Sequence, residues 1–235
     1  MDTPELLAEL TVLQRRFHAG LREAPPAAPV PTCAGWTVTD LADHLAGVHA
    51  WAAMMASDQR SVRPPARRGN IADHYAGRAD ELHHALAQLD PEALVPTFDG
   101  RGPAAFWHRR QTHETLIHLY DLSLARGTAP PETAVEVWAD AVDEVVHVLH
   151  PRQVRLDRTK PPQDSLRLVA EDAGAPGGTA WTLPAGAATP AATVTGTAQH
   201  LALVLWRRLS LDAADVVVSG DADAARRELD APVTP

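Results

Sequence analysis

Cysteine is almost absent from this chain, with Cys33 as the single one among 235 residues. One cysteine excludes an intrachain disulfide and every zinc motif that needs several cysteines. Lysine is equally scarce, because Lys160 is the one lysine, whereas Ala, Arg, Pro, Asp and Val are abundant. This composition is typical of a bacterial genome rich in G and C.

The chain also lacks a long hydrophobic run and a secretion signal. No apolar stretch approaches the roughly 18 residues of a membrane-spanning helix. Residues 1–5 do not begin a basic segment followed by an apolar one, as a signal peptide would. These two features predict a cytoplasmic protein with no membrane partner.

A basic surface stripe is missing as well. The formal net charge is −9 and the pI is about 5.7. The basic clusters are short pairs, Arg67-Arg68, Arg109-Arg110, Arg207-Arg208 and Arg226-Arg227. A nucleic-acid-binding domain normally concentrates positive charge on one face, so we expect no nucleic-acid partner. The acidic balance favours solubility rather than any particular partner.

The first part of the chain has the apolar spacing of amphipathic helices. This spacing predicts helices over residues 3–22, 38–56, 71–89, 104–126 and 131–149. Thr37 and Asp40 form a capping-box pattern at the start of the second helix, with Asp in place of the usual Glu. A basic, proline-rich loop is expected at residues 60–70. We predict that residues 1–150 form an up-down helical bundle.

The pattern changes after Pro151. Residues 151–163 hold three prolines and five charged side chains and are expected to be a linker. Apolar residues then alternate with a period of two. Strands are expected near residues 166–170, 179–183, 191–195 and 215–219, and helices at 197–209 and 221–229. We predict a small α+β domain over residues 164–235, which makes the whole chain a two-domain α+β protein.

Helix 104–126 has an unusual polar face. Its stripe consists of Trp107, Gln111, Glu114, His118 and Asp121. Polar groups are costly in a bundle core, so a stripe of them suggests a purpose. Glu114 and His118 are four residues apart and lie on one face of the helix. A carboxylate and an imidazole placed this way can share one divalent metal ion.

A third metal ligand could come from His44 on the helix at 38–56. Bundle metal sites are built from side chains on facing helices, and three protein ligands with one open position are the catalytic zinc pattern. Spacing alone leaves other interpretations open. Glu114 and His118 could be a solvated surface pair, and His44 a structural histidine. Asp121 could hold the ring of His118 or be a carboxylate at the helix end.

Two motifs indicate a family. Residues 31–49 read Pro-Thr-Cys-Ala-Gly-Trp-Thr-Val-Thr-Asp-Leu-Ala-Asp-His-Leu-Ala-Gly-Val-His. This segment resembles the signature of the mycothiol-dependent maleylpyruvate isomerase family, part of the DinB-like group of metal-binding four-helix bundles. The family's later motif, Arg-x-x-x-Glu-x-x-x-His-x-x-Asp, is matched by Arg110, Glu114, His118 and Asp121. The resemblance implies zinc ligands at His44, Glu114 and His118.

The second domain carries a weaker likeness. Residues 195–208 and 218–222 resemble the family's small module of sterol-carrier-like type. In the family this module is thought to supply a catalytic arginine. Arg208 or Arg207 is the nearest counterpart here, and either could instead be a surface charge.

The resemblance also implies a chemistry. The family uses zinc to hold and activate the thiol of mycothiol, a low-molecular-weight thiol of actinobacteria. A metal-bound thiolate would add to an electrophilic small molecule, because the thiolate is the reactive form of a thiol. Isomerisation follows if the thiol leaves again, and S-transfer if it stays.

Other functions fit the same residues. The metal could be another divalent ion instead of zinc. One alternative is a non-catalytic metal-binding or sensor protein of the DinB-like group. Another is a metal-dependent hydrolase in which bound water replaces the thiol.

Overall fold

The computed structural model describes residues 1–58, 69–187 and 189–234. It divides the chain into two compact units, Met1–Pro131 and Glu132–Pro235. A helical first unit and a sheet-containing second unit confirm the predicted α+β class. The loop expected at residues 60–70 falls almost wholly outside the described residues. Nowhere in the described chain is a helix both long enough and apolar enough to cross a bilayer.

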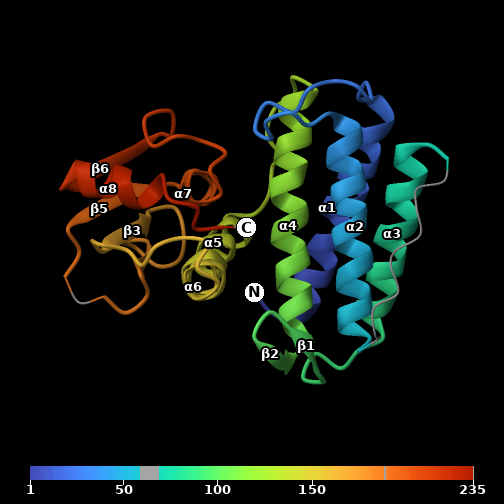
Figure 1. The fold of residues 1–235 in the computed structure, drawn as a ribbon, viewed down its shortest axis with the longest axis horizontal. Coiled ribbons are helices and arrows are strands. Elements are labelled where there is room, and N and C mark those ends of the chain that lie inside the picture. Colours follow the sequence, from blue (N-terminus) through green and yellow to red (C-terminus); the bar gives the residue numbers. More distant parts are fainter. Residues whose placement is uncertain (59–68, 188, 235) are drawn as a thin grey trace. The chain divides into compact units, whose positions relative to one another are not determined.

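Long helices build the first unit, as Figure 1 shows. They are α1 (Thr3–Glu23), α2 (Val38–Ala56), α3 (Ile71–Ala87) and α4 (Ala105–Ala125). Each of α1 and α2 packs against both α3 and α4, so the four helices surround one shared core. Along the bundle, α1 and α4 run in one direction and α2 and α3 in the other (Figure 1). The predicted ends of these helices agree with the structure to within two residues.

The start of α2 is set by its own sequence. Thr37 and Asp40 form the predicted capping box, in which each backbone N–H donates to the other's side chain. Gly35 precedes it with a φ of +80°, a conformation that glycine adopts without steric cost. Together these residues fix where the first turn of α2 begins. They thereby fix which face of the helix carries His44 two turns later.

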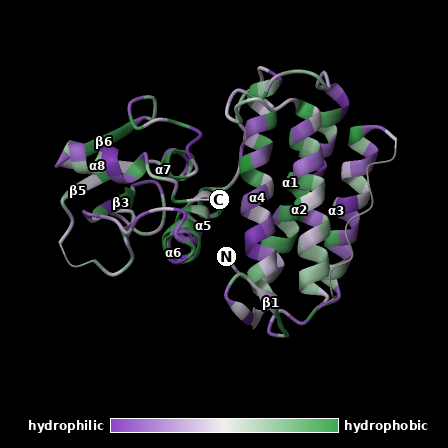
Figure 2. Cartoon of the chain, in the orientation of Figure 1, coloured by the Kyte–Doolittle hydropathy of each residue, from purple (hydrophilic) through white to green (hydrophobic). Residues whose placement is uncertain are grey.

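The bundle core is apolar at one end and polar along part of α4. The apolar end includes Leu10, Leu82, Leu86, Val95 and Trp107, all buried. Figure 2 shows hydrophilic residues along much of α4. The buried side chains of α4 nevertheless include more than half of the helix, so its polar groups lie inside the bundle.

A hairpin closes the end of the bundle where α3 leads into α4 (Figure 1). It consists of β1 (Leu94–Thr97) and β2 (Gly100–Pro103), paired antiparallel. The sequence predicted no strand between the helices at 71–89 and 104–126, and glycine and proline are rare inside strands. The indole N–H of Trp107 donates to the backbone oxygen of Pro96 at 2.8 Å and ties the hairpin to the core.

The second unit begins earlier than the sequence indicated. Helix α5 (Val135–Glu144) continues through a π-helical turn (Val145–Leu149) into α6 (His150–Arg155). The expected bundle limit at residue 150 and the linker at 151–163 are therefore wrong in part. Helix α5 packs against a later helix of its own unit, α7 (Ala198–Leu205). Pro151 lies in the first turn of α6, where proline is tolerated.

A mixed four-stranded sheet forms the rest of this unit. Its strands are β3 (Leu166–Ala170), β4 (Thr179–Leu183), β5 (Ala192–Gly196) and β6 (Val216–Gly220), in the order β4-β3-β5-β6. β3 and β5 are parallel, and the outer pairs are antiparallel. Helices α7 (Ala198–Leu205) and α8 (Ala222–Leu229) complete it. Helix α7 ends before the predicted residue 209, because Arg207 adopts a left-handed φ of +58°.

Candidate metal centre

The structure brings His44, Glu114 and His118 together. His44 comes from α2, and the other two come from consecutive turns of α4. One ligand atom of each side chain lies within 4.8 Å of the other two. Glu114 Oε1 lies 3.5 Å from His44 Nε2 and 3.3 Å from His118 Nε2. In the described part of the chain, this is the one cluster of three such side chains close enough to share an ion.

The cluster is buried on one side and open on the other. The side chains of His118 and Glu114 are 6% and 15% exposed, whereas that of His44 is 37% exposed. The His44 ring lies edge-on to the His118 ring, with centroids 4.9 Å apart, and also contacts the Trp36 ring. His44, on α2, is therefore the most exposed of the three side chains.

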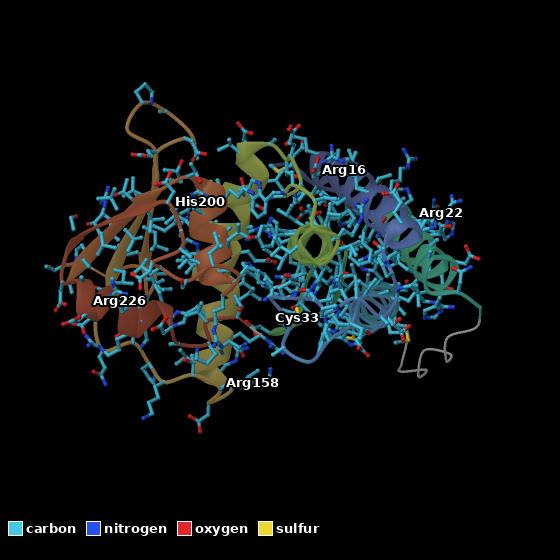
Figure 3. All side chains as sticks on the ribbon, turned by 90° about the horizontal axis from the view of Figure 1, so that it is seen from above. Arg16, Arg22, Cys33, Arg158, His200 and Arg226 are labelled. Atoms are coloured by element: carbon cyan, nitrogen blue, oxygen red, sulfur yellow. The ribbon has the colours of Figure 1, made fainter. Side chains whose placement is uncertain are left out.

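Asp121 holds the ring of His118 from behind. Its Oδ2 lies 2.9 Å from His118 Nδ1, so Nδ1 carries a proton and donates it to the carboxylate, while Nε2 faces Glu114. The buried carboxylate also accepts hydrogen bonds from Thr32 Oγ1 at 2.6 Å and from Cys33 Sγ at 3.6 Å. Figure 3 labels Cys33 on the connection between α1 and α2. The sequence did not indicate these two contacts.

Glu114 is held as a carboxylate. Burial alone would raise its pKa, but hydrogen bonds with His118 and His44 and the charge of Arg110 outweigh burial, so its pKa lies well below the ordinary value. Arg110 Nη2 donates to Glu114 Oε2 at 2.8 Å. Burial likewise opposes the charged form of His118, yet Asp121 and Glu114 outweigh it and raise the pKa of that ring.

These residues fit a divalent metal ion. A lone pair on His118 Nε2 would face an ionised oxygen of Glu114 only 3.3 Å away, which is repulsive unless a proton or a cation lies between them. Two imidazole nitrogens and one carboxylate oxygen are also a donor set that zinc accepts, with a fourth position left for a ligand. The arrangement can therefore hold a cation and leave it accessible.

A second set of buried polar groups crosses the bundle beside the cluster. His49 Nδ1 lies 2.8 Å from Gln111 Oε1, and His49 Nε2 lies 3.4 Å from the hydroxyl of Tyr75. All three side chains are fully buried. Burial lowers the pKa of His49 to about 4, so this ring is neutral. The sequence placed Gln111 on the polar stripe of its helix but did not pair it with His49.

Arg207 and Arg208 lie in the second unit, directly after α7. Arg207 is exposed, and Arg208 Nη1 donates to the backbone oxygen of Trp206 at 2.9 Å. A catalytic role for either arginine stays a prediction.

Family models match most of the chain. The model described as "Mycothiol maleylpyruvate isomerase N-terminal domain" matches residues 7–123, and "MDMPI C-terminal domain" matches residues 136–227. The two matched ranges lie on either side of the boundary between the units after Pro131.

Solved structures show the same fold. The crystal structure of the mycothiol-dependent maleylpyruvate isomerase aligns with a TM-score of 0.68 at 15% identity, and a histidine-to-alanine mutant of it aligns with 0.70 at 16%. In both cases the alignment covers 94% of this chain and 95% of the other.

Two curated relatives come from Mycobacterium tuberculosis. They are "Uncharacterized protein Rv0738" of strain H37Rv and "Uncharacterized protein MT0763" of strain CDC 1551. Each is 31% identical over 133 residues, which cover 52% of this chain and 68% of the relative. Their names state no activity.

Proposed function

The chain belongs to the mycothiol-dependent maleylpyruvate isomerase family, and from this premise we propose that it is an enzyme that uses mycothiol to transform an electrophilic small molecule. The observation that supports the proposal most is the convergence of His44, Glu114 and His118 within 4.8 Å. Side chains from two helices have no structural need to present three ligand atoms to one point. A site for a catalytic cation explains this arrangement.

In this proposal the three side chains hold zinc or another divalent ion. Such an ion stabilises the anion of a thiol bound to it, so a larger fraction is present as the reactive thiolate at neutral pH. Histidine and glutamate suit the role because they leave one coordination position for the thiol.

The surrounding residues keep the ligands in the protonation states that bind a metal ion. Asp121 keeps the proton of His118 on Nδ1, so Nε2 is available as a ligand. Arg110 keeps Glu114 ionised through a charge-assisted hydrogen bond of 2.8 Å. The partly exposed His44 lies on the side from which a thiol and its co-substrate can enter.

The reaction is an addition of the thiol sulfur to an electron-poor carbon of the substrate. A new carbon–sulfur bond forms while the electron pair of the attacked double bond moves towards an adjacent carbonyl. If the carbon–sulfur bond breaks again after rotation, the electron pair returns to the double bond and the product is an isomer. If the bond persists and the enolate takes up the proton that the thiol lost, the product is a thioether. A catalytic arginine from the second unit, Arg207 or Arg208, is part of the proposal and would bind an anionic group of the substrate.

The test combines metal content with dependence on the thiol. We expect purified protein to carry about one divalent ion per chain and to convert maleylpyruvate when mycothiol is present. His44→Ala should remove the ion and the turnover, while His84→Ala on the exposed face of α3 should change neither. Purified protein that carries no metal, and whose properties do not change with His44→Ala, would refute the proposal that the chain is a metal-dependent enzyme. Turnover without the thiol would instead indicate a metal-dependent hydrolase.

A further inference from the structure

Gln111 differs from the threonines that follow it on α4. Its neighbours Thr112 and Thr115 donate to backbone oxygens one turn earlier, at 2.8 and 2.7 Å. Gln111 is fully buried, and among the described residues its amide nitrogen has no hydrogen-bond partner. A buried donor without a partner is unfavourable, and an apolar side chain would avoid the cost. The amide group therefore suggests an acceptor that does not belong to the protein.

His49 and Tyr75 set the orientation of this amide. A neutral imidazole has one N–H and one lone pair. The His49 ring donates from Nδ1 to Gln111 Oε1 at 2.8 Å, and its Nε2 faces the Tyr75 hydroxyl at 3.4 Å. Because the carboxamide oxygen faces His49, the amide NH₂ group points away from it. Both of its N–H bonds remain available for another acceptor.

This amide lies beside the candidate metal centre. Gln111 precedes Glu114 by three residues, so the two side chains share one face of α4. The charges of Glu114, His118 and His44 all act on the ring of His49 that holds Gln111. The hydrogen-bonded chain from Tyr75 to Gln111 therefore runs alongside the cluster.

We propose that the side-chain amide of Gln111 binds the substrate, by donating to a carboxylate oxygen of the molecule that occupies the site of His44, Glu114 and His118. His49 and Tyr75 act through Gln111 and are positioning residues. The inference rests on the proposed function, because it assigns a specificity-determining contact to that same site. An amide donor favours oxygen acceptors, so the site discriminates for electrophiles that carry a carboxylate over apolar ones.

The experiment measures binding without turnover. The full-length protein is loaded with Co²⁺, whose visible absorption reports changes around the ion, and is titrated with succinate, a saturated diacid that cannot accept a thiol. We expect Gln111→Leu and Gln111→Glu to weaken succinate binding about 10- to 100-fold, as for the loss of a hydrogen bond to a charged group. Gln111→Glu keeps an oxygen for His49 but removes the donors.

Ser123→Ala is the matched control. It removes a buried hydroxyl of α4 that donates to the backbone oxygen of Leu119 at 2.9 Å, and it should leave succinate binding unchanged. Circular dichroism and Co²⁺ stoichiometry verify that each variant is folded and loaded. If Gln111→Leu does not fold, Gln111→Glu decides the question.

The outcomes separate the inference from the proposed function. Variants of Gln111 that load Co²⁺ and bind succinate as tightly as the wild type overturn the inference alone. Wild-type protein that loads Co²⁺ but binds no succinate overturns it as well. Wild-type protein that takes up no Co²⁺ overturns the proposed function and, with it, the role of Gln111.

Discussion

The bundle buries two histidines in opposite electrostatic surroundings. His118 lies between the carboxylates of Glu114 and Asp121, and its pKa is raised although burial opposes the charged ring. His49 lies between Gln111 and Tyr75, which are neutral, and burial lowers its pKa to about 4. The two rings differ in their partners far more than in their depth. Carboxylates, and not burial, therefore separate the candidate cation site from the neutral hydrogen-bonded group of Tyr75, His49 and Gln111 in this core.

The two regions are consecutive along α4. Gln111 belongs to the neutral group that it forms with His49 and Tyr75, and Glu114, one turn later, belongs to the cluster with His44 and His118. An amide at position 111 and a carboxylate at position 114 have similar shapes but different charges. Exchanging one group for the other is the direct way to test whether charge defines the site.

The largest effect is expected from Glu114→Gln, which makes the cluster neutral like its neighbour. Loss of the anionic ligand should weaken metal binding by more than the ten- to hundredfold seen for outer hydrogen-bond partners. Competition titration with a chromophoric chelator measures the affinity. His49→Gln, a polar replacement in the neutral group, should retain about one ion per chain. Equal metal affinities in Glu114→Gln and wild type would show that the carboxylate is not a ligand.

A smaller effect is expected from acid, which should lower the stability of the fold through the buried, neutral ring of His49. The pKa of His49 is about 4 in the folded protein and ordinarily 6.5, so between these values the unfolded chain binds the extra proton. The free energy of unfolding therefore falls as the pH decreases from 6.5 to 4, by up to about 3 kcal/mol at 1.36 kcal/mol per pKa unit. Urea unfolding of the metal-free protein at several pH values measures this decrease.

His49→Gln supplies the control for the acid effect. The raised pKa of His118 contributes the opposite trend, since a raised pKa stabilises the fold at low pH and this stabilisation is lost as the pH rises. Both proteins share that contribution, so the difference between them isolates His49. The variant should lose less stability than the wild type between pH 6.5 and 4. If the free energy of unfolding depends on pH in the same way in both proteins, the acid effect does not come from His49.

The smallest effect is expected behind the cluster. Asp121→Asn keeps an oxygen for His118 Nδ1 but removes the negative charge that makes Nε2 a better ligand. We expect metal affinity to fall about 10- to 100-fold, as for other partners of this kind. Ser123→Ala, on the same helix, should leave the affinity at the wild-type value. If Asp121→Asn binds the metal as tightly as the wild type, the carboxylate serves its hydrogen bonds with Thr32 and Cys33 and does not strengthen metal binding.

Local sequence patterns were sufficient for most of the fold. The capping box at Thr37 and Asp40 and the apolar period of each long helix are properties of neighbouring residues, so they could be read without tertiary information. The period of two in the last third of the chain likewise predicted the strands of the sheet.

Contacts between elements far apart in the sequence were harder to predict. The apolar stripe of α5 indicates that the helix packs, but not that its partner is α7. Pro151 suggested a break, although the structure accommodates it in the first turn of α6 after a π-helical turn. Hairpin β1–β2 contains glycine and proline that resemble a loop, and its attachment depends on the indole of Trp107.

The candidate site was only partly visible in the sequence. The i, i+4 spacing of Glu114 and His118 indicated a shared face, and family resemblance was needed to select His44 from among 12 histidines. The contacts of Thr32 and Cys33 with Asp121, and the pairing of His49 with Gln111, join segments far apart in the chain. No local pattern encodes such contacts, because they arise when the helices pack.

The hydrogen bond from Thr32 to Asp121 has a consequence for how the site is assembled during folding. These residues are 89 positions apart in the sequence, and contacts of such long range form after the helices they join. Asp121, which contacts the ring of His118 from within α4, therefore gains its contacts with Thr32 and Cys33 only when the α1–α2 connection has docked on α4. Uptake of an ion, followed in time during refolding, would report the docking of that connection as a late event, and the bound ion would then slow its release.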